Sequence, residues 1–150
     1  MNSTSTFEIQ TASLGDLGEL RKLEQVCFGK DSWPLIDLFG VLTFPNVVRL
    51  KAVIDGRMVG FAAGERKPAE GRGWVTTIGV QPEYRRSGIG RVLLAATEEN
   101  LGLPHIRLCV RRSNLAAITL YEQTGYRHVS IWPEYYIDGE DALVMEKVRL

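Results

Sequence analysis

The sequence predicts an α/β fold in which a mixed sheet of about seven strands carries helices on both faces. Three observations predict it. Short runs of alternating apolar and polar residues are interspersed with longer runs of helical period. Hairpin signals lie towards both ends of the chain, with strand–helix alternation between them. No repeat, low-complexity tract or linker interrupts the pattern, so we expect residues 1–150 to form a single domain.

The first half of the chain predicts three strands and two helices. Ser13 can cap a helix, because Asp16 three residues later completes a capping box. One apolar stripe is expected along this helix, made by Leu14, Leu17, Leu20, Leu23 and Val26. Asp55-Gly56-Arg57 stands between two apolar runs and indicates a hairpin. The expected elements are a strand at 7–11, a helix after Ser13, a short helix at 35–42, strands at 47–54 and 58–65, and a loop at 66–72.

The second half predicts four strands and two helices. Gly102 and Pro104 end a helix that opens at Gly88. Ser113 or Asn114 caps a further helix. The expected elements are strands at 73–80, 105–111, 126–132 and 142–148, with helices at 88–100 and from the cap to residue 124.

Composition narrows the class of protein. Eighteen basic and eighteen acidic side chains cancel, so no overall field attracts nucleic acid or a membrane. Cys27 and Cys109 form neither a disulfide framework nor a metal-binding spacing. The polar N-terminus is not a signal peptide, and no apolar run is long enough to span a membrane. We therefore expect a cytoplasmic protein with no metal site, no nucleic-acid partner and no membrane partner.

The segment from Val75 to Leu94 carries the main functional signal. It reads as an apolar strand, a proline turn, a basic loop with two glycines, and an amphipathic helix. A helix that opens on Gly88-x-Gly90 presents unpaired N–H groups at the positive end of its dipole. Arginine side chains at 85, 86 and 91 add positive charge, so the loop is suited to a phosphate or pyrophosphate. The alternative is a basic turn whose glycines serve only packing.

Two common nucleotide loops are excluded by the residues after Gly90. A Walker loop requires Lys and then Ser or Thr, whereas Arg91 and Val92 follow. A dinucleotide fingerprint requires a third glycine where Leu93 stands. The remaining pattern, Arg-x-x-Gly-x-Gly, resembles the acetyl-CoA pyrophosphate loop of the GNAT superfamily of N-acetyltransferases. The resemblance implies a mixed, mostly antiparallel sheet and a coenzyme site formed by Ile78, Gly79, Val80, Arg85, Arg86, Ser87, Gly88, Ile89, Gly90, Arg91 and Asn114.

A second segment, from Asn114 to Tyr126, resembles the same superfamily. It reads Asn-x-x-Ala-x-x-Leu-Tyr-x-x-x-Gly-Tyr, with Asn114 and Tyr121 two helical turns apart on one face. The resemblance implies that Asn114 contacts the coenzyme and that Tyr121 is the acid for the departing thiolate. Taken alone, Asn114 is a helix cap and Tyr121 a half-buried aromatic residue.

The C-terminal segment from Glu134 to Met145 resembles the ribosomal-protein-alanine N-acetyltransferases and their N-terminal acetyltransferase relatives. The resemblance implies that Tyr135 and Tyr136 lie over the first residues of a peptide substrate; the alternative is a tyrosine-rich hairpin packed on the sheet. In those relatives a glutamate in Leu-Glu-Val-Arg is the general base. Here Cys109 occupies that position, and we interpret it as a packing residue.

These observations predict an acetyl-CoA-dependent N-acetyltransferase whose acceptor is the α-amine of a protein or peptide N-terminus. Transfer to a small amine, such as a polyamine, amino acid or drug, stays open, as does a non-catalytic acetyl-CoA-binding module. The protein is expected to be a monomer or a homodimer.

Overall fold

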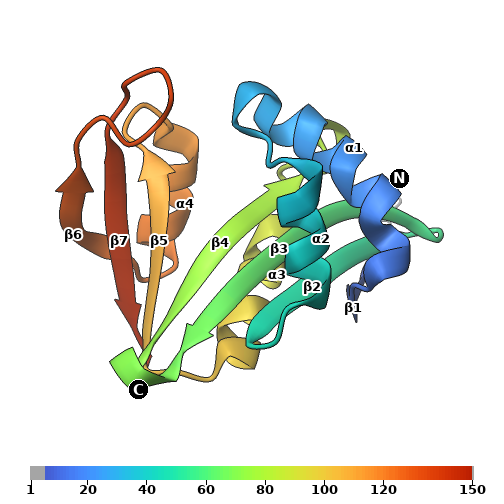
Figure 1. Cartoon of the computed structure of the whole chain (residues 1–150), viewed down its shortest axis with the longest axis horizontal. Helices are drawn as coiled ribbons and strands as arrows, with labels where there is room; N and C mark the ends of the chain where they lie inside the picture. The colour runs from blue at the N-terminus through green and yellow to red at the C-terminus, as the bar shows by residue number, and fades with distance from the viewer. Residues whose placement is uncertain (1–5, 150) are drawn as a thin grey trace.

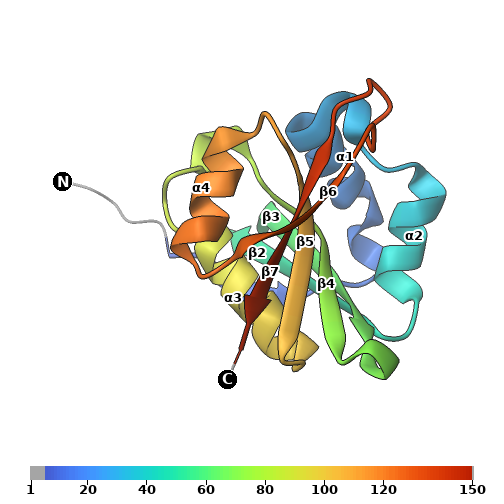
Figure 2. The same cartoon turned by 90° about the vertical axis from the view of Figure 1, so that its left-hand side faces the viewer.

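The computed structural model describes residues 6–149 and shows one seven-stranded sheet in the order β1-β2-β3-β4-β5-β7-β6. Neighbouring strands are antiparallel except β4 and β5, which are parallel. Helices α1 and α2 cover one face, and α3 and α4 lie on the other (Figures 1 and 2). The strands are β1 (Glu8–Thr11), β2 (Val47–Ile54), β3 (Arg57–Lys67), β4 (Arg72–Val80), β5 (His105–Arg111), β6 (Arg127–Trp132) and β7 (Ala142–Val148). The helices are α1 (Leu17–Phe28), α2 (Leu35–Thr43), α3 (Ile89–Leu101) and α4 (Leu115–Gln123).

Local signals place several boundaries as expected. The main-chain N–H of Ser13 donates to the Asp16 carboxylate at 2.8 Å, which completes the capping box at the start of the α1 region. Asp55 and Gly56 both have positive φ, at 50° and 75°, as a two-residue hairpin turn of the type I′ class requires. Arg57 is consequently the first residue of β3 and not part of the turn.

The expected loop at 66–72 is wrong. β3 continues to Lys67 and β4 begins at Arg72, so only a 3-10 turn, Pro68–Glu70, and its cap Gly71 separate them. Lys67 and Arg72 are paired across the two strands. Polar residues continue both strands here because the paired ends extend beyond the core, where alternation of apolar residues is lost.

The apolar stripe expected on α1 is partly wrong. Leu20 and Leu23 are buried, but Leu14 and Val26 are 47% and 59% exposed. Glu24 is buried in their place, 2% exposed. At 100° per residue, Glu24 lies only about 40° from Leu20 around the helix, whereas Val26 lies about 120° from it. Leu14 belongs to a 3-10 turn before α1 and so is not in phase with it.

Two apolar clusters hold the layers together. One joins α3 and α4 to the sheet and includes Leu93, Ile106 and Met145, all fully buried. The other joins α1 and α2 to β3 and includes Leu38 and Phe61. Each such side chain stabilises the fold by about 1.5–3 kcal/mol through burial. Within residues 6–149, none of the helices has the length and apolarity needed to cross a membrane.

The sheet opens between β4 and β5, and this opening positions the functional site. The two strands pair from Arg72 with His105 as far as Val75 with Leu108, and then they separate (Figure 1). The register between β3 and β4 shifts at the same level, so that Thr76 is an extra residue on β4. Such a bulge bends a strand and increases its twist. The bulge therefore lies where β4 turns away from β5.

Candidate active site

A cleft of about 800 Å³ occupies the gap between the separated strands. β4 supplies one wall with residues 75–80, and β5 supplies the other with residues 108–111. The start of α3, one face of α4 and the segment between α1 and α2 complete the lining. A volume of this size suits an extended small ligand.

The N-terminus of α3 opens into this cleft without a cap. Gly88 is the N-cap residue with φ of 86°, no side chain caps the helix, and its first turn contains no acidic residue. A Cβ at Gly88 would meet nothing within 4 Å, so the space before it is open. Arg85, Arg86 and Arg91 also line the cleft. Main-chain N–H groups, the helix dipole and guanidinium groups thus converge on one place that can hold an anion.

The edge of β4 offers main-chain hydrogen-bonding groups to the same cleft. The N–H of Gln81 donates to the carbonyl of Val59 on the β3 side at 2.8 Å. Because these groups alternate in direction along a strand, the N–H and C=O of Val80 and Ile78 face the gap. The Val80 carbonyl already accepts from Arg85 Nε at 2.9 Å and from Cys27 Sγ at 3.4 Å. The free groups can pair with an extended ligand as a further strand would.

Gly79 allows α1 to approach this part of β4 closely. A Cβ at that position would lie 3.1 Å from Cys27 Sγ and 3.2 Å from Phe28 Cζ, tighter than ordinary contact. Any larger residue would push α1 away from β4. The glycine therefore keeps Cys27 beside the carbonyl of Val80.

Tyr121 and Cys109 both line the cleft, and both keep their protons at neutral pH. Burial raises the pKa of Tyr121 to about 12 and that of Cys109 to about 11. The ring of Tyr121 packs edge-on against Tyr126, with 5.8 Å between centroids.

Asn114 caps α4, its Oδ1 accepting from the N–H of Ala117 at 3.2 Å. Asn114 therefore caps α4 and lines the cleft at the same time.

Arg111 connects the two loops that close one end of the cleft. Its guanidinium donates to both oxygens of Asp31 at 2.7 Å, to Glu140 at 2.7 Å and to Asp138 at 2.9 Å. Asp31 precedes α2, whereas Asp138 and Glu140 lie between β6 and β7. The same guanidinium lies 4.2 Å from the centroid of the Tyr136 ring. The hydrogen bond from Lys30 lowers the pKa of Asp138, and hydrogen bonds from Ser113 and Arg111 lower the pKa of Glu140.

The two tyrosines expected to lie over a substrate pack against each other, with 5.1 Å between ring centroids, but only one of them lines the cleft. Tyr136 lines the cleft, and burial raises its pKa to about 12. Tyr135 packs against Trp132, with 5.4 Å between centroids, and is not among the residues that line the cleft. It is 53% exposed. Tyr136 is thus placed to touch a ligand inside the cleft, and Tyr135 lies at its rim.

Most of the expected coenzyme-site residues surround the cleft. Those that line it are Ile78, Gly79, Val80, Arg85, Arg86, Gly88, Ile89, Gly90, Arg91 and Asn114. Ser87 does not, because its hydroxyl donates to the Tyr84 carbonyl and closes the turn. Arg91 also donates to the Gln123 side chain on α4. Ser87 therefore shapes the loop that precedes α3.

Glu24 is a residue that sequence reasoning missed. Its carboxylate accepts from the N–H of Trp33 at 3.2 Å and from the hydroxyl of Thr77 at 3.1 Å. Burial raises its pKa. Glu24 thereby joins the segment before α2 to β4, beside the cleft. The available signal was a carboxylate at a position in phase with the buried leucines of α1.

Comparison with known proteins accounts for this architecture. The sequence model of the "Acetyltransferase (GNAT) family" matches residues 18–126. The chain belongs to this family. The predicted superfamily, fold class and acyltransferase class are therefore confirmed.

Relatives of this GNAT chain match it over nearly its whole length. It is 32% identical over 146 residues to NAA10, the catalytic subunit of the N-terminal acetyltransferase A complex of Arabidopsis thaliana, a match that covers 93% of this chain and 76% of that protein. It is 33% identical over 150 residues to the N-alpha-acetyltransferase RimI of Mycobacterium tuberculosis, covering 96% and 94%. The crystal structure of the ribosomal-protein-S18-alanine N-acetyltransferase from Escherichia coli has a TM-score of 0.86 at 29% identity, over 95% of this chain and 94% of that one.

Proposed function

We propose that the protein transfers an acetyl group from acetyl-CoA to the α-amine of a protein N-terminus. One observation carries the proposal. The opening between β4 and β5 brings an uncapped helix N-terminus, a free strand edge and the Tyr121 side chain around one cleft. The printed names of NAA10 and RimI, which describe N-terminal or N-alpha acetylation, support the choice of acceptor.

The residues of the cleft fit the parts of acetyl-CoA. The N–H groups from Gly88 to Arg91, with the Arg85 and Arg86 side chains, would hold the diphosphate. The Val80 N–H and the Ile78 carbonyl, which are free, would pair with the amide-bearing arm. When bound, the coenzyme supplies an acetyl group activated as a thioester.

Two groups of the chain are suited to the transfer step. The Ile78 N–H faces the cleft and can donate to the acetyl oxygen as negative charge develops there. Tyr121 can donate its proton to the departing sulfur, since a pKa of about 12 keeps the hydroxyl protonated at physiological pH. Both groups are fixed by the fold before any ligand binds.

The absence of a glutamate base at position 109 favours an acceptor amine that loses its proton easily. A thiol whose pKa is about 11 does not accept a proton at neutral pH, so Cys109 cannot replace a glutamate. Deprotonating an α-amine of pKa near 7.8 at pH 7 costs about 1 kcal/mol, whereas a lysine near 10.4 costs about 4.6 kcal/mol. The α-amine therefore needs little help beyond water and main-chain carbonyls.

The proposal is tested by measuring coenzyme A release with two matched peptides. One has a free N-terminus and no lysine; the other has a blocked N-terminus and one lysine. We expect faster release with the first, and mass spectrometry should locate the acetyl group on its α-amine. Release that is faster with the lysine peptide, or absent with both, would overturn the proposal.

A further inference from the structure

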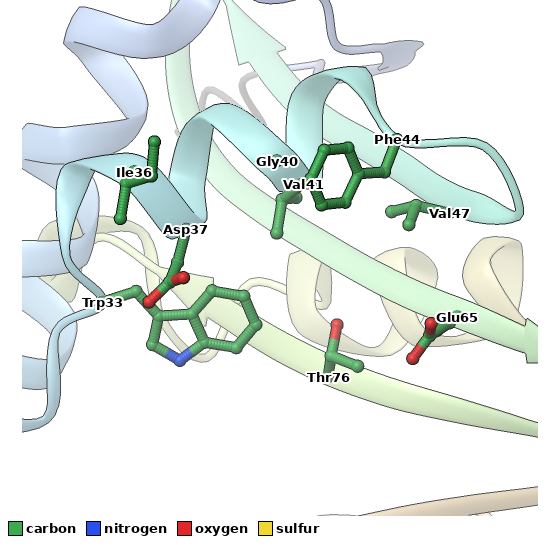
Figure 3. Close-up of a pocket in the computed structure, with 9 residues that line it drawn as sticks. All are labelled: Trp33, Ile36, Asp37, Gly40, Val41, Phe44, Val47, Glu65 and Thr76. Atoms are coloured by element: carbon green, nitrogen blue, oxygen red, sulfur yellow. The ribbon is translucent and has the colours of Figure 1, made fainter.

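A second cavity, of about 440 Å³, lies between α2 and the sheet. Trp33, Val41 and Phe44 line it from the α2 side, and Glu65 on β3 and Thr76 on β4 line it from the sheet (Figure 3). Its volume is within the range of small-ligand sites. Nothing in the transfer step described above uses it.

The cavity is continuous with the reaction cleft. Trp33 and Thr76 line both spaces. The Trp33 main chain is held at this boundary because its backbone N–H donates to the buried carboxylate of Glu24. Thr76 is the bulge residue of β4, and its hydroxyl donates to the carbonyl of Ala63 at 3.2 Å. A ligand that leaves the cleft along β4 therefore reaches this cavity.

The lining combines apolar walls with negative charge. Val41, Phe44 and the Trp33 ring give the cavity an apolar surface, and its two ionisable lining residues, Asp37 and Glu65, are both acidic. Figure 3 shows the Asp37 carboxylate directed towards the Trp33 indole. Within residues 6–149, Asp37 forms no ion pair, whereas Glu65 lies 3.7 Å from Lys67 Nζ in an exposed pair. Asp37 therefore provides the carboxylate that is free to pair with a cation.

This lining favours an aliphatic side chain that ends in a cation. A purely apolar group would desolvate the carboxylates without compensation. An arginine or lysine side chain packs its methylene groups on the apolar walls and brings its charge to Asp37. The Trp33 ring adds a favourable surface for that charge.

We propose that this cavity binds a basic side chain of the acceptor, at one of positions two to four from the reacting terminus. The inference rests on the proposed function, because the acceptor must be a peptide. Thr76 lies two residues from Ile78, where the acetyl group would lie, which corresponds to about 7 Å along a strand. One or two extended residues, each spanning about 3.4 Å, together with a long side chain cover that distance. The cavity thus makes the enzyme selective for basic N-terminal sequences.

The test uses peptides that begin with alanine and carry arginine, citrulline, leucine or glutamate at position two, three or four. Citrulline matches arginine in shape but has no charge, and neither accepts an acetyl group under these conditions. We expect kcat/KM at least tenfold higher for arginine than for citrulline at one of these positions, mainly through KM. Asp37→Asn should bring the arginine peptide to the level of the citrulline peptide.

A matched control is Asp55→Asn, which removes the same charge at the hairpin. Asp55 lies at the opposite end of β2 from Val47, eight residues or about 25 Å away. This variant should keep the arginine preference of the wild type. Glu65→Gln should reduce the preference less than Asp37→Asn does, because Lys67 already pairs with Glu65.

The outcomes separate this inference from the proposed function. Equal kcat/KM for arginine and citrulline at all three positions would overturn the inference alone, as would a preference for leucine. An arginine preference that survives Asp37→Asn would also overturn it, provided that circular dichroism and acetyl-CoA affinity show an intact fold. Acetylation of no peptide would overturn the proposed function, and the inference with it.

Discussion

Tyr121 and Tyr126 are neighbouring buried tyrosines, and replacing each by phenylalanine should separate catalysis from stability. Their rings lie 5.8 Å apart, and they are 8% and 3% exposed. The Tyr126 hydroxyl donates to buried Glu98 at 2.6 Å. The Tyr121 hydroxyl forms no hydrogen bond within residues 6–149 and belongs to the cleft lining. The two variants therefore remove the same atom from different roles.

The first variant should lower kcat, whereas the second should lower the stability of the fold. Tyr121→Phe removes the proposed acid, and lost acid catalysis lowers kcat by about 10²-fold or more, equivalent to about 2.7 kcal/mol in the barrier. Its effect on stability should be small, because no protein partner is lost. Tyr126→Phe removes a hydrogen bond to a buried carboxylate, which costs about 1.5–3 kcal/mol. For a chain of this size, Tm should fall by roughly 3–10 °C.

The assay combines kcat from coenzyme A release with Tm from thermal unfolding. Acetyl-CoA affinity by calorimetry should stay near the wild-type value for both variants. A Tyr121→Phe enzyme with unimpaired kcat would refute the assignment of the acid. Equal losses of kcat in both variants would refute it as well, because packing and not proton transfer would then explain the effect.

Three further predictions concern single positions. Gly88→Val should abolish acetyl-CoA binding in calorimetry, because its side chain enters the space before α3 and strains a residue with φ of 86°; Gly71→Val, also at positive φ, is the control. Cys109→Glu restores a carboxylate beside the acceptor and should raise the rate with a lysine-only peptide by about 10²-fold. Glu24→Gln should make stability less dependent on pH above about pH 4.5, measured by urea unfolding at pH 5 and pH 8. Burial raises the pKa of Glu24, so its stabilising contribution is lost as pH rises through that value.

Each of these predictions has a contradicting result. Coenzyme binding that survives in Gly88→Val, or is lost equally in Gly71→Val, would remove the helix N-terminus from the site. An unchanged lysine rate in Cys109→Glu would show that this position does not face the acceptor. Identical pH dependence of unfolding in wild type and Glu24→Gln would mean that the carboxylate has the same proton affinity folded and unfolded.

The fold was largely predictable because local patterns and the final structure agree. His105–Arg111 and Ala142–Val148 have the predicted limits, since apolar residues alternate cleanly along both strands. The loop before α3 was predictable because Gly88 and the neighbouring arginines together indicate a loop that can bind an anion. Errors occurred where the pattern was weak. The polar ends of the strands near Lys67 were predicted to be a loop. Val26 was predicted to be buried, although its position around the helix leaves it exposed.

The rest of the site depends on contacts that no local pattern contains. Asp31 is 80 positions from Arg111 along the chain and Glu24 is 53 from Thr77, yet each pair is hydrogen bonded. The cavity under α2 depends on where the Trp33 ring comes to rest. The separation of β4 from β5 follows from the extra residue at Thr76, which in the sequence is an ordinary strand residue.

The interrupted pairing between β4 and β5 means that the folded protein keeps unpaired strand edges inside its own sheet. In the proposed complex, acetyl-CoA lying along β4 at Val80 would take the place of a neighbouring strand and pair with main-chain groups that have no strand partner. Folding and loading are then thermodynamically linked, and a hundredfold excess of donor over its Kd adds about 2.7 kcal/mol of resistance to unfolding. The free energy of unfolding of the ligand-free enzyme is therefore lower than that of the enzyme with bound acetyl-CoA. Its resistance to unfolding thus depends on the supply of its own substrate.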